Sequence, residues 1–166
     1  DERLPPAHAV VNPNRLDDLS GLGHLAAVGL VFMTIVAVNR VLRTRGFWSA
    51  QRSEPDLLGF LDLVALGTVA DVVALKGLNR AFVAKGLLAM RRREHVGLTA
   101  LMDVSRLGGP PEPFHLGFLL GPRINAGGRI GRASLGVDLL LADDPIEAAR
   151  IAAELDRLNT ERRAIE

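Results

Sequence analysis

An apolar run spanning residues 61–75 contains an aspartate near its end. The run reads LDLVALGTVADVVAL, and small or branched apolar residues flank Asp71 on both sides. Such a run predicts a core segment, and an ionised carboxylate in a core is costly unless it is paired, hydrogen-bonded or bound to a metal ion. Gly67 and Thr68 predict a break in regular structure just before it, so we expect Asp71 at the mouth of a pocket.

Asp71 also has a structural interpretation, as a helix N-cap or a solvated loop carboxylate. A single carboxylate does not hold a catalytic divalent ion, because Mg²⁺ and Mn²⁺ take several oxygen or imidazole ligands. The four histidines are scattered, without an HExxH motif or a close pair, so we expect surface or core roles for them. The residues alone leave both interpretations of Asp71 open.

The amino-acid composition limits the size of the domain, the make-up of its core and the kinds of site it can hold. Its 166 residues are enough for one domain with a sizeable core, and only 4% are aromatic, so the core must be aliphatic. The absence of cysteine excludes disulfides and thiolate metal sites and is compatible with the cytosol. A net charge of +1 gives no global argument for nucleic-acid binding, which must come from local clusters.

The apolar spacing predicts a helix-dominated chain with at least one strand. Residues 8–12, HAVVN, are typical of a short strand that Pro13 ends. The longest apolar stretch, residues 25–38, is too short to span a bilayer of roughly 30 Å and predicts a buried helix. Helices are expected over residues 24–45, 56–66, 77–93, 97–107, 133–142 and from Pro145 onward.

The last helix has an explicit start and a narrow apolar stripe. Asp144 fits the N-cap, Pro145 the first helical position, and Glu147 completes a capping box. Apolar residues then recur at helical spacing and predict a face that lies against a partner surface; they are Ala148, Ile151, Leu155, Leu158 and Ile165.

Residues 121–132, GPRINAGGRIGR, form a second notable segment. It contains four glycines, three arginines and an asparagine. Glycines let a backbone approach a ligand closely, and arginine forks suit phosphates. The segment lacks the Lys-Ser/Thr ending of a P-loop and the glycine spacing of a dinucleotide turn. We expect an anion-binding loop, and the alternative is an exposed flexible loop with solvated charges.

Three blocks of the chain together resemble a known family. Residues 67–80, which begin GTVADVV, resemble the aspartate block of the DHH phosphoesterases. The segment GPRINAGGR, residues 121–129, is similar to the GPR-x-NA-x-GR signature of the RecJ branch of that superfamily. Residues 4–14 resemble the segment just after the Asp-His-His motif. The resemblance to the RecJ family, bacterial single-strand-specific exonucleases, covers essentially the whole chain.

The resemblance implies a fold and a division of the chain. It implies an α/β fold, in which residues 1–143 are the helix-rich C-terminal portion of a DHH catalytic domain with a partial parallel sheet. Residues 144–166 would begin a long interdomain connector helix. The other metal-binding motifs would precede Asp1 and a nucleic-acid-binding domain would follow Glu166, so the isolated segment is expected to be inactive.

The resemblance also implies a chemistry. RecJ enzymes hydrolyse single-stranded DNA from the 5′ end to mononucleotides, in DNA repair and recombination, with two Mn²⁺ or Mg²⁺ ions. By position Asp71 would be a metal ligand and catalytic residue of the fourth motif, and the DNA-facing residues would be Arg123, Asn125 and Arg129. The implied partners are single-stranded DNA and, through the full-length protein, single-strand-binding protein and helicases, with no membrane, in the cytoplasm.

Two departures and two alternatives accompany this prediction. Ala74 stands where the family usually has proline, and Gly127 where it commonly has alanine; both are small, so we expect the geometry to survive. One alternative is another DHH phosphoesterase acting on oligonucleotides or cyclic dinucleotides, which the arginine-rich segment argues against. The other is a non-catalytic relative that binds DNA or a partner, which the presence of Asp71 argues against.

Overall fold

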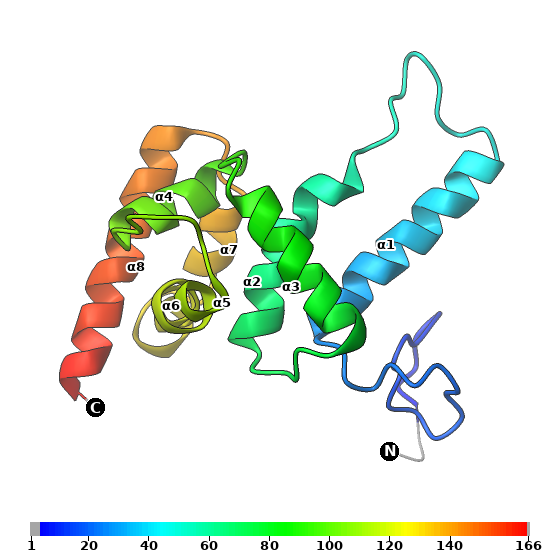
Figure 1. The fold of residues 1–166 in the computed structure, drawn as a ribbon, viewed down its shortest axis with the longest axis horizontal. Coiled ribbons are helices and arrows are strands. Elements are labelled where there is room, and N and C mark those ends of the chain that lie inside the picture. The colour runs from blue at the N-terminus through cyan, green and yellow to red at the C-terminus, as the bar shows by residue number, and fades with distance from the viewer. Residues whose placement is uncertain (1–3, 166) are drawn as a thin grey trace.

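The computed structural model describes residues 4–165 as helices joined by loops (Figure 1). Figure 1 shows α2 and α3 between α1 on one side and the group of α4, α6, α7 and α8 on the other. The elements in chain order are α1 (Ala27–Thr44), a 3₁₀ turn η1 (Leu57–Phe60), α2 (Leu61–Ala70), α3 (Gly77–Met90), α4 (Val96–Val104), α5 (Pro113–His115), a π-helical turn η2 (Leu116–Leu120), α6 (Gly121–Ile130), α7 (Leu135–Leu140) and α8 (Pro145–Ile165).

The predicted α/β class with a partial parallel sheet is wrong for this structure. Between residues 4 and 165 there is no strand, and the only β-type pairing is an isolated bridge between Ser49 and Arg52. The predicted strand at residues 8–12 is an irregular and largely exposed segment. Its β-branched side chains fit a pleated surface, but a strand needs a neighbouring strand to pair its backbone groups, and none of the described elements supplies one.

The main core lies between α2, α3 and the C-terminal helices. Its fully buried members include Leu101, Leu116, Leu120, Leu139 and Leu155. Burying each such leucine contributes about 1.5–3 kcal/mol relative to leaving it exposed. This aliphatic core confirms the expectation drawn from the scarcity of aromatic residues.

Helix α8 closes this core along α4, α6 and α7. Asp144 caps it as predicted, because its Oδ1 accepts a hydrogen bond of 3.0 Å from the backbone N–H of Ile146. The predicted apolar stripe is buried from Ala148 to Leu158, whereas Ile165 remains 77% exposed. The stripe therefore packs against the body of the molecule over about its first four turns, and the last turn lies outside the core.

Helices α2 and α3 approach each other closely at a glycine. A Cβ atom at Gly86 would lie 2.1 Å from the carbonyl oxygen of Leu61 and 2.4 Å from the Cβ of Ala65. Only a residue without a side chain fits there, so Gly86 brings the two backbones together. The pair α2–α3 thus forms the rigid centre on which the other helices pack.

Helix α1 forms where expected but is not buried. Only Gly29, Phe32 and Asn39 are buried in it, and Phe32 meets Phe82 of α3 edge-to-face with ring centroids 5.6 Å apart. The prediction of a buried helix is therefore wrong for the part of the chain that the structure describes. By length and composition alone α1 is apolar enough to cross a bilayer, a test that core helices of soluble proteins also pass.

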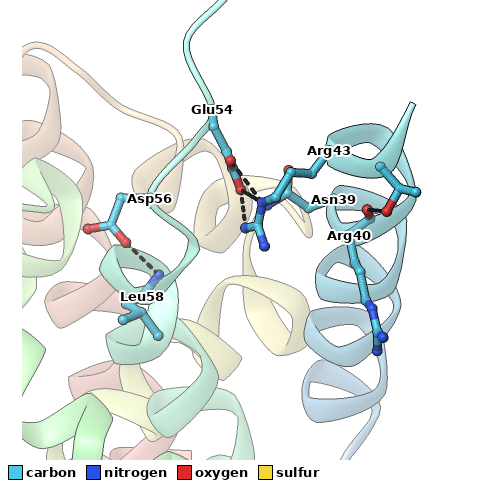
Figure 2. A network of polar contacts seen from close by, with 7 residues as sticks. Asn39, Arg40, Arg43, Glu54, Asp56 and Leu58 are labelled. Atoms are coloured by element: carbon cyan, nitrogen blue, oxygen red, sulfur yellow. Dashed lines mark hydrogen bonds and ion pairs between the residues drawn. The ribbon is translucent and has the colours of Figure 1, made fainter. Parts of the chain in front are cut away.

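The loop that follows α1 is tied back to it by Glu54 (Figure 2). The Glu54 carboxylate accepts a hydrogen bond of 2.7 Å from Asn39 Nδ2 and pairs with the Arg43 guanidinium, whose Nε lies 3.0 Å from Oε1. Farther along, Asp56 accepts the backbone N–H of Leu58 at 3.0 Å and starts η1. These contacts fix where the chain turns from α1 into α2.

Candidate functional site

Asp71 lies at the C-terminal end of α2, exposed to solvent. The predicted break at Gly67 and Thr68 is wrong, because α2 continues through both to Ala70. A Cβ at Gly67 would lie 2.9 Å from Cγ1 of Val28, so this glycine serves close packing with α1 instead. The helix therefore carries Asp71 out of the apolar core that its neighbours suggested.

The charge of Asp71 has no structural benefit at this position. A carboxylate at the C-terminal end of a helix meets the negative end of the helix dipole. Nothing within residues 4–165 pairs with its side chain. The next residue, Val72, is 88% exposed and has a φ of 56°, a left-handed conformation that is costly for a β-branched residue. Exposed charge beside local strain favours a functional role over a structural one.

The loop that carries Asp71 is anchored by Asn79. This side chain is fully buried, and its Nδ2 donates to the carbonyl oxygens of Ala74 at 3.0 Å and His24 at 2.8 Å. The two bonds join the loop between α2 and α3 to the chain just before α1. Asp71 thus projects from a segment held at both ends.

The buried carboxylate of the apolar run is Asp62, which the sequence interpretation passed over. Asp62 is 2% exposed, and its Oδ2 lies 2.6 Å from Nδ1 of His95. Its Oδ1 accepts the backbone N–H of Leu63 at 2.7 Å. A signal for this existed, because Asp62 stands three residues before Ala65 and four before Leu66, both buried, at helical spacing. The pair fastens the start of α2 to the start of α4.

The GPRINAGGR segment is helix α6, not the predicted loop. It begins against the last turn of α2, since a Cβ at Gly121 would lie 3.3 Å from the Cβ of Ala70. A Cβ at Gly127 would lie 3.1 Å from Leu155 and 3.3 Å from Leu135. Each glycine lowers helix propensity by about 1 kcal/mol, and here packing against α2, α7 and α8 outweighs that cost. Asp71 and the start of α6 are consequently neighbours.

Arg123 points from α6 toward α8. Its Nε lies 2.8 Å from Oδ1 of Asp156, its Nη1 donates to the carbonyl oxygen of Leu119 at 2.8 Å, and its side chain is only 12% exposed. These contacts hold α6 to α8. The predicted contact of Arg123 with DNA stays a prediction, and the observed role of this side chain is to orient the helix.

Asn125 and Arg129 lie together on another side of α6. With Pro122 and Arg162 they line a hollow of about 130 Å³. Arg162 comes from the last turns of α8, and its Nη2 donates to Oδ1 of Asn159 at 3.3 Å. The sequence interpretation missed Arg162 because only packing places that turn of α8 beside α6. The arrangement gathers two guanidinium groups and an amide, a set of donors suited to phosphate oxygens.

The described residues do not by themselves form a metal centre. Within residues 4–165 no three histidine, cysteine, aspartate or glutamate side chains are grouped as a metal ion requires. Asp71 offers one exposed carboxylate, which fits a hard divalent ion as one ligand among several. Among residues 4–165, Asp71 can therefore supply one ligand to such a site.

Comparison with known proteins gives a consistent result. No protein-family model matches the chain. The single-stranded-DNA-specific exonuclease RecJ of Dickeya dadantii is 46% identical over 169 residues, which cover 99% of this chain and 29% of that protein. The chain is a homologue of one segment of RecJ. Escherichia coli RecJ is 42% identical with the same coverage, and Thermus thermophilus RecJ is 35% identical over 99% of this chain and 22% of its own length.

Solved RecJ structures agree with the sequence relationship. The structure of Thermus thermophilus RecJ in complex with Mn²⁺ aligns with a TM-score of 0.62 and 41% identity, over 66% of this chain and 17% of that one. The complex with Mg²⁺ aligns equally well. Solved RecJ structures are thus complexes with Mn²⁺ or with Mg²⁺, the metals that the resemblance implied. The chain spans 29% of the length of the D. dadantii and E. coli RecJ proteins, so it corresponds to a part of them.

Proposed function

We propose that this chain is part of a metal-dependent exonuclease that hydrolyses single-stranded DNA in the 5′→3′ direction and releases mononucleotides. The observation that carries the proposal is 35–46% identity to RecJ exonucleases over nearly the whole chain. The structure adds support, because it brings the exposed Asp71 beside the helix that begins with the family's GPR signature. The activity belongs to the longer protein, and the segment alone is expected to be inactive.

Asp71 serves in this proposal as a metal ligand and catalytic residue. Bound Mn²⁺ or Mg²⁺ ions supply an activated water and stabilise negative charge on the attacking and leaving oxygens. The Asp71 carboxylate would hold such an ion from a loop that Asn79 anchors, which limits how far the ligand moves. The remaining ligands are expected from other parts of the longer protein.

Asn125 and Arg129 bind the phosphate backbone next to that centre. They share a hollow with Arg162, and their amide and guanidinium groups donate hydrogen bonds suited to phosphate oxygens. Arg123 contributes through its ion pair with Asp156, which sets the orientation of α6 relative to α8. It reaches the DNA only if that pair opens.

The remaining expectations follow from the same assignment. Residues 1–143 are proposed as the C-terminal portion of the catalytic domain, and residues 144–166 as the start of a connector helix whose first turns pack on that domain. Because the proposed roles are in repair and recombination of DNA, the proposed location is the cytoplasm, without membrane association. Single-strand-binding protein and helicases are its proposed protein partners.

Asp71→Asn tests the assignment directly. In the full-length protein we expect this isosteric change to reduce the hydrolysis of 5′-labelled single strands in Mn²⁺ by at least 100-fold, about 2.7 kcal/mol in activation free energy, because the amide is a poor ligand for a hard cation. The folded state should be unaffected, since the side chain is exposed and unpaired among the described residues. The measurement is the rate of mononucleotide release.

Asp143→Asn is the matched control, since Asp143 is another exposed carboxylate that lies in a loop before α8. We expect this variant to retain the full rate. Normal hydrolysis by Asp71→Asn would refute the ligand assignment. Hydrolysis of cyclic dinucleotides in place of single strands by the unaltered protein would favour the other DHH phosphoesterase activity.

A further inference from the structure

Two phenylalanine rings lie stacked on the surface just before α6. The rings of Phe114 and Phe118 have centroids 4.9 Å apart and planes inclined by 24°. Phe114 is 59% exposed and Phe118 is 62% exposed. Burying a phenyl ring is among the larger stabilising terms in folding, so two adjacent exposed rings leave that stabilisation unused in this structure. A stacked, solvent-facing pair is a ready surface for another flat ring.

The local backbone holds this pair outward. Leu116 and Leu120 of the π turn are fully buried. Gly117 packs against α2, because a Cβ atom at this position would lie 3.4 Å from Cγ1 of Val69. The opposite side of the turn must then face solvent, and Phe118 lies there. Single π turns inside helices are rare and occur often at functional sites. The rings are therefore fixed to the same part of α2 that ends in Asp71.

The rings continue the face of α6 that carries the polar side chains. Pro122 follows Phe118 by four residues, Asn125 by three more and Arg129 by a further four, a spacing that keeps side chains near one side of a helical run. Eleven residues at 1.5 Å separate Phe118 from Arg129 by about 16 Å along the axis.

The charge of this face suits a polyanion. The guanidinium groups on this face are those of Arg129 and, from α8, Arg162, whereas Arg123 and Arg132 are paired with Asp156 and Asp138. Single-stranded nucleic acids bind where a basic groove follows the backbone and aromatic side chains stack on the bases. The observed order, with aromatic rings at one end of the face and guanidinium groups at the other, has both components.

We propose that Phe114 and Phe118 form a base-stacking platform for the single-stranded DNA substrate. A base of the strand stacks on the exposed rings, and phosphates several nucleotides along reach Asn125 and Arg129. The inference rests on the proposed function, and it assigns to this segment a role in holding bases that neither Asp71 nor the polar side chains of α6 can supply. Because stacking accepts every base, the platform gives affinity for single strands without sequence preference.

The test compares binding to strands with and without bases. The full-length protein and its Phe114→Ala and Phe118→Ala variants are titrated in EDTA, which prevents hydrolysis, with a fluorescent 20-nucleotide strand and with the same strand carrying consecutive abasic sites. We expect each alanine variant to bind the normal strand about tenfold more weakly, because the aromatic face is lost. Binding of the abasic strand should change by less than twofold.

Two controls separate stacking from other causes. Ile146→Ala removes an exposed apolar side chain from the start of α8 and should bind both strands normally. Phe118→Leu keeps apolar bulk without a ring and should resemble Phe118→Ala. Thermal unfolding should be the same in all variants, since both rings are exposed.

The outcomes distinguish the platform from the proposed function. Equal losses on normal and abasic strands, or no loss on either, would overturn the platform even if hydrolysis in Mn²⁺ is normal. A base-dependent loss in a protein that does not hydrolyse single strands would retain the platform and reject the exonuclease. Restored affinity in Phe118→Leu would show that apolar bulk, covered by another protein segment, is what matters and would also overturn the platform.

Discussion

At the scale of single residues, two aspartates of one apolar run have opposite environments. Asp62 is buried against His95, and Asp71 is exposed at the helix end. A buried carboxylate that loses its partner is strongly destabilising, whereas an exposed one costs little. The two residues should therefore respond to substitution in different measurements, Asp62 in stability and Asp71 in catalysis.

His95→Ala should lower the free energy of unfolding by about 2–4 kcal/mol, because it leaves the Asp62 carboxylate buried without its partner. Asp62→Ala/His95→Ala should be no less stable than His95→Ala alone, since the uncompensated charge is then gone. Urea denaturation at pH 7 measures both. Additive losses in the double variant would show that the two side chains are not energetically coupled.

The apolar run shows what a sequence can and cannot reveal about such residues. It correctly indicated a carboxylate among core residues, but it indicated the wrong one, because Gly67 was taken as the end of a helix that in fact runs to Ala70. Glycine ends helices by conformational freedom, and it also occurs inside them where another helix crosses closely. Only the contact of Gly67 with Val28 of α1 shows that this glycine lies inside a helix, and that contact depends on the tertiary structure.

At the scale of elements, the connection from α1 to α2 depends on a single carboxylate. The hydrogen bond from Arg43, and after it the bond from Asn39, hold the pKa of Glu54 below its ordinary value of 4.5. A group whose pKa is depressed in the folded state stabilises that state above its unfolded pKa, and this contribution is lost as the pH falls through the lower, folded value. The loop should therefore detach in acid before the helices do.

Trp48, the only tryptophan of the chain, reports on this loop. Below pH 4.5 we expect its emission to shift while the far-ultraviolet circular dichroism of the helices is still unchanged. Glu54→Gln should show the shifted emission already at pH 7, because the neutral amide cannot pair with Arg43. An acid shift that is identical in Glu54→Gln would assign the transition to another group.

The spacing of apolar residues correctly predicted most of the helices. The predictions that were wrong depend on contacts between elements far apart in the sequence. The ranges expected for α1, α3, α4 and α8 match the structure to within a few residues. Asp144 caps α8 as predicted, but the Glu147 carboxylate, expected to complete a capping box, pairs with Arg150 instead. Residues 121–132 were predicted as a loop because of their four glycines and proline, and contacts of Gly121 and Gly127 with other helices explain why residues 121–130 are the helix α6. The strand at residues 8–12 failed for the converse reason, since it lacks a partner.

At the scale of the whole molecule, the two sides of the α2–α3 centre are unequally covered. On one side α4, α6, α7 and α8 enclose the main core. On the other, α1 exposes Val31, Ile35 and Val38 at 59%, 45% and 52%, and their spacing of four and three places them on one face. Exposed apolar faces of this kind mark interaction surfaces or sites of association.

The 166-residue chain on its own should therefore associate through α1. Replacing Ile35 and Val38 together by lysine should lower the association constant at least tenfold, because two charges then interrupt the apolar face. The helix content should change little. Analytical ultracentrifugation at several concentrations gives the association constant. The matched control is lysine at Val137 and Ile146, which are exposed at 58% and 81% on α7 and α8; these changes should leave association as it was. Equal effects of both pairs would mean that added charge acts generally, and that the face of α1 has no special part in association.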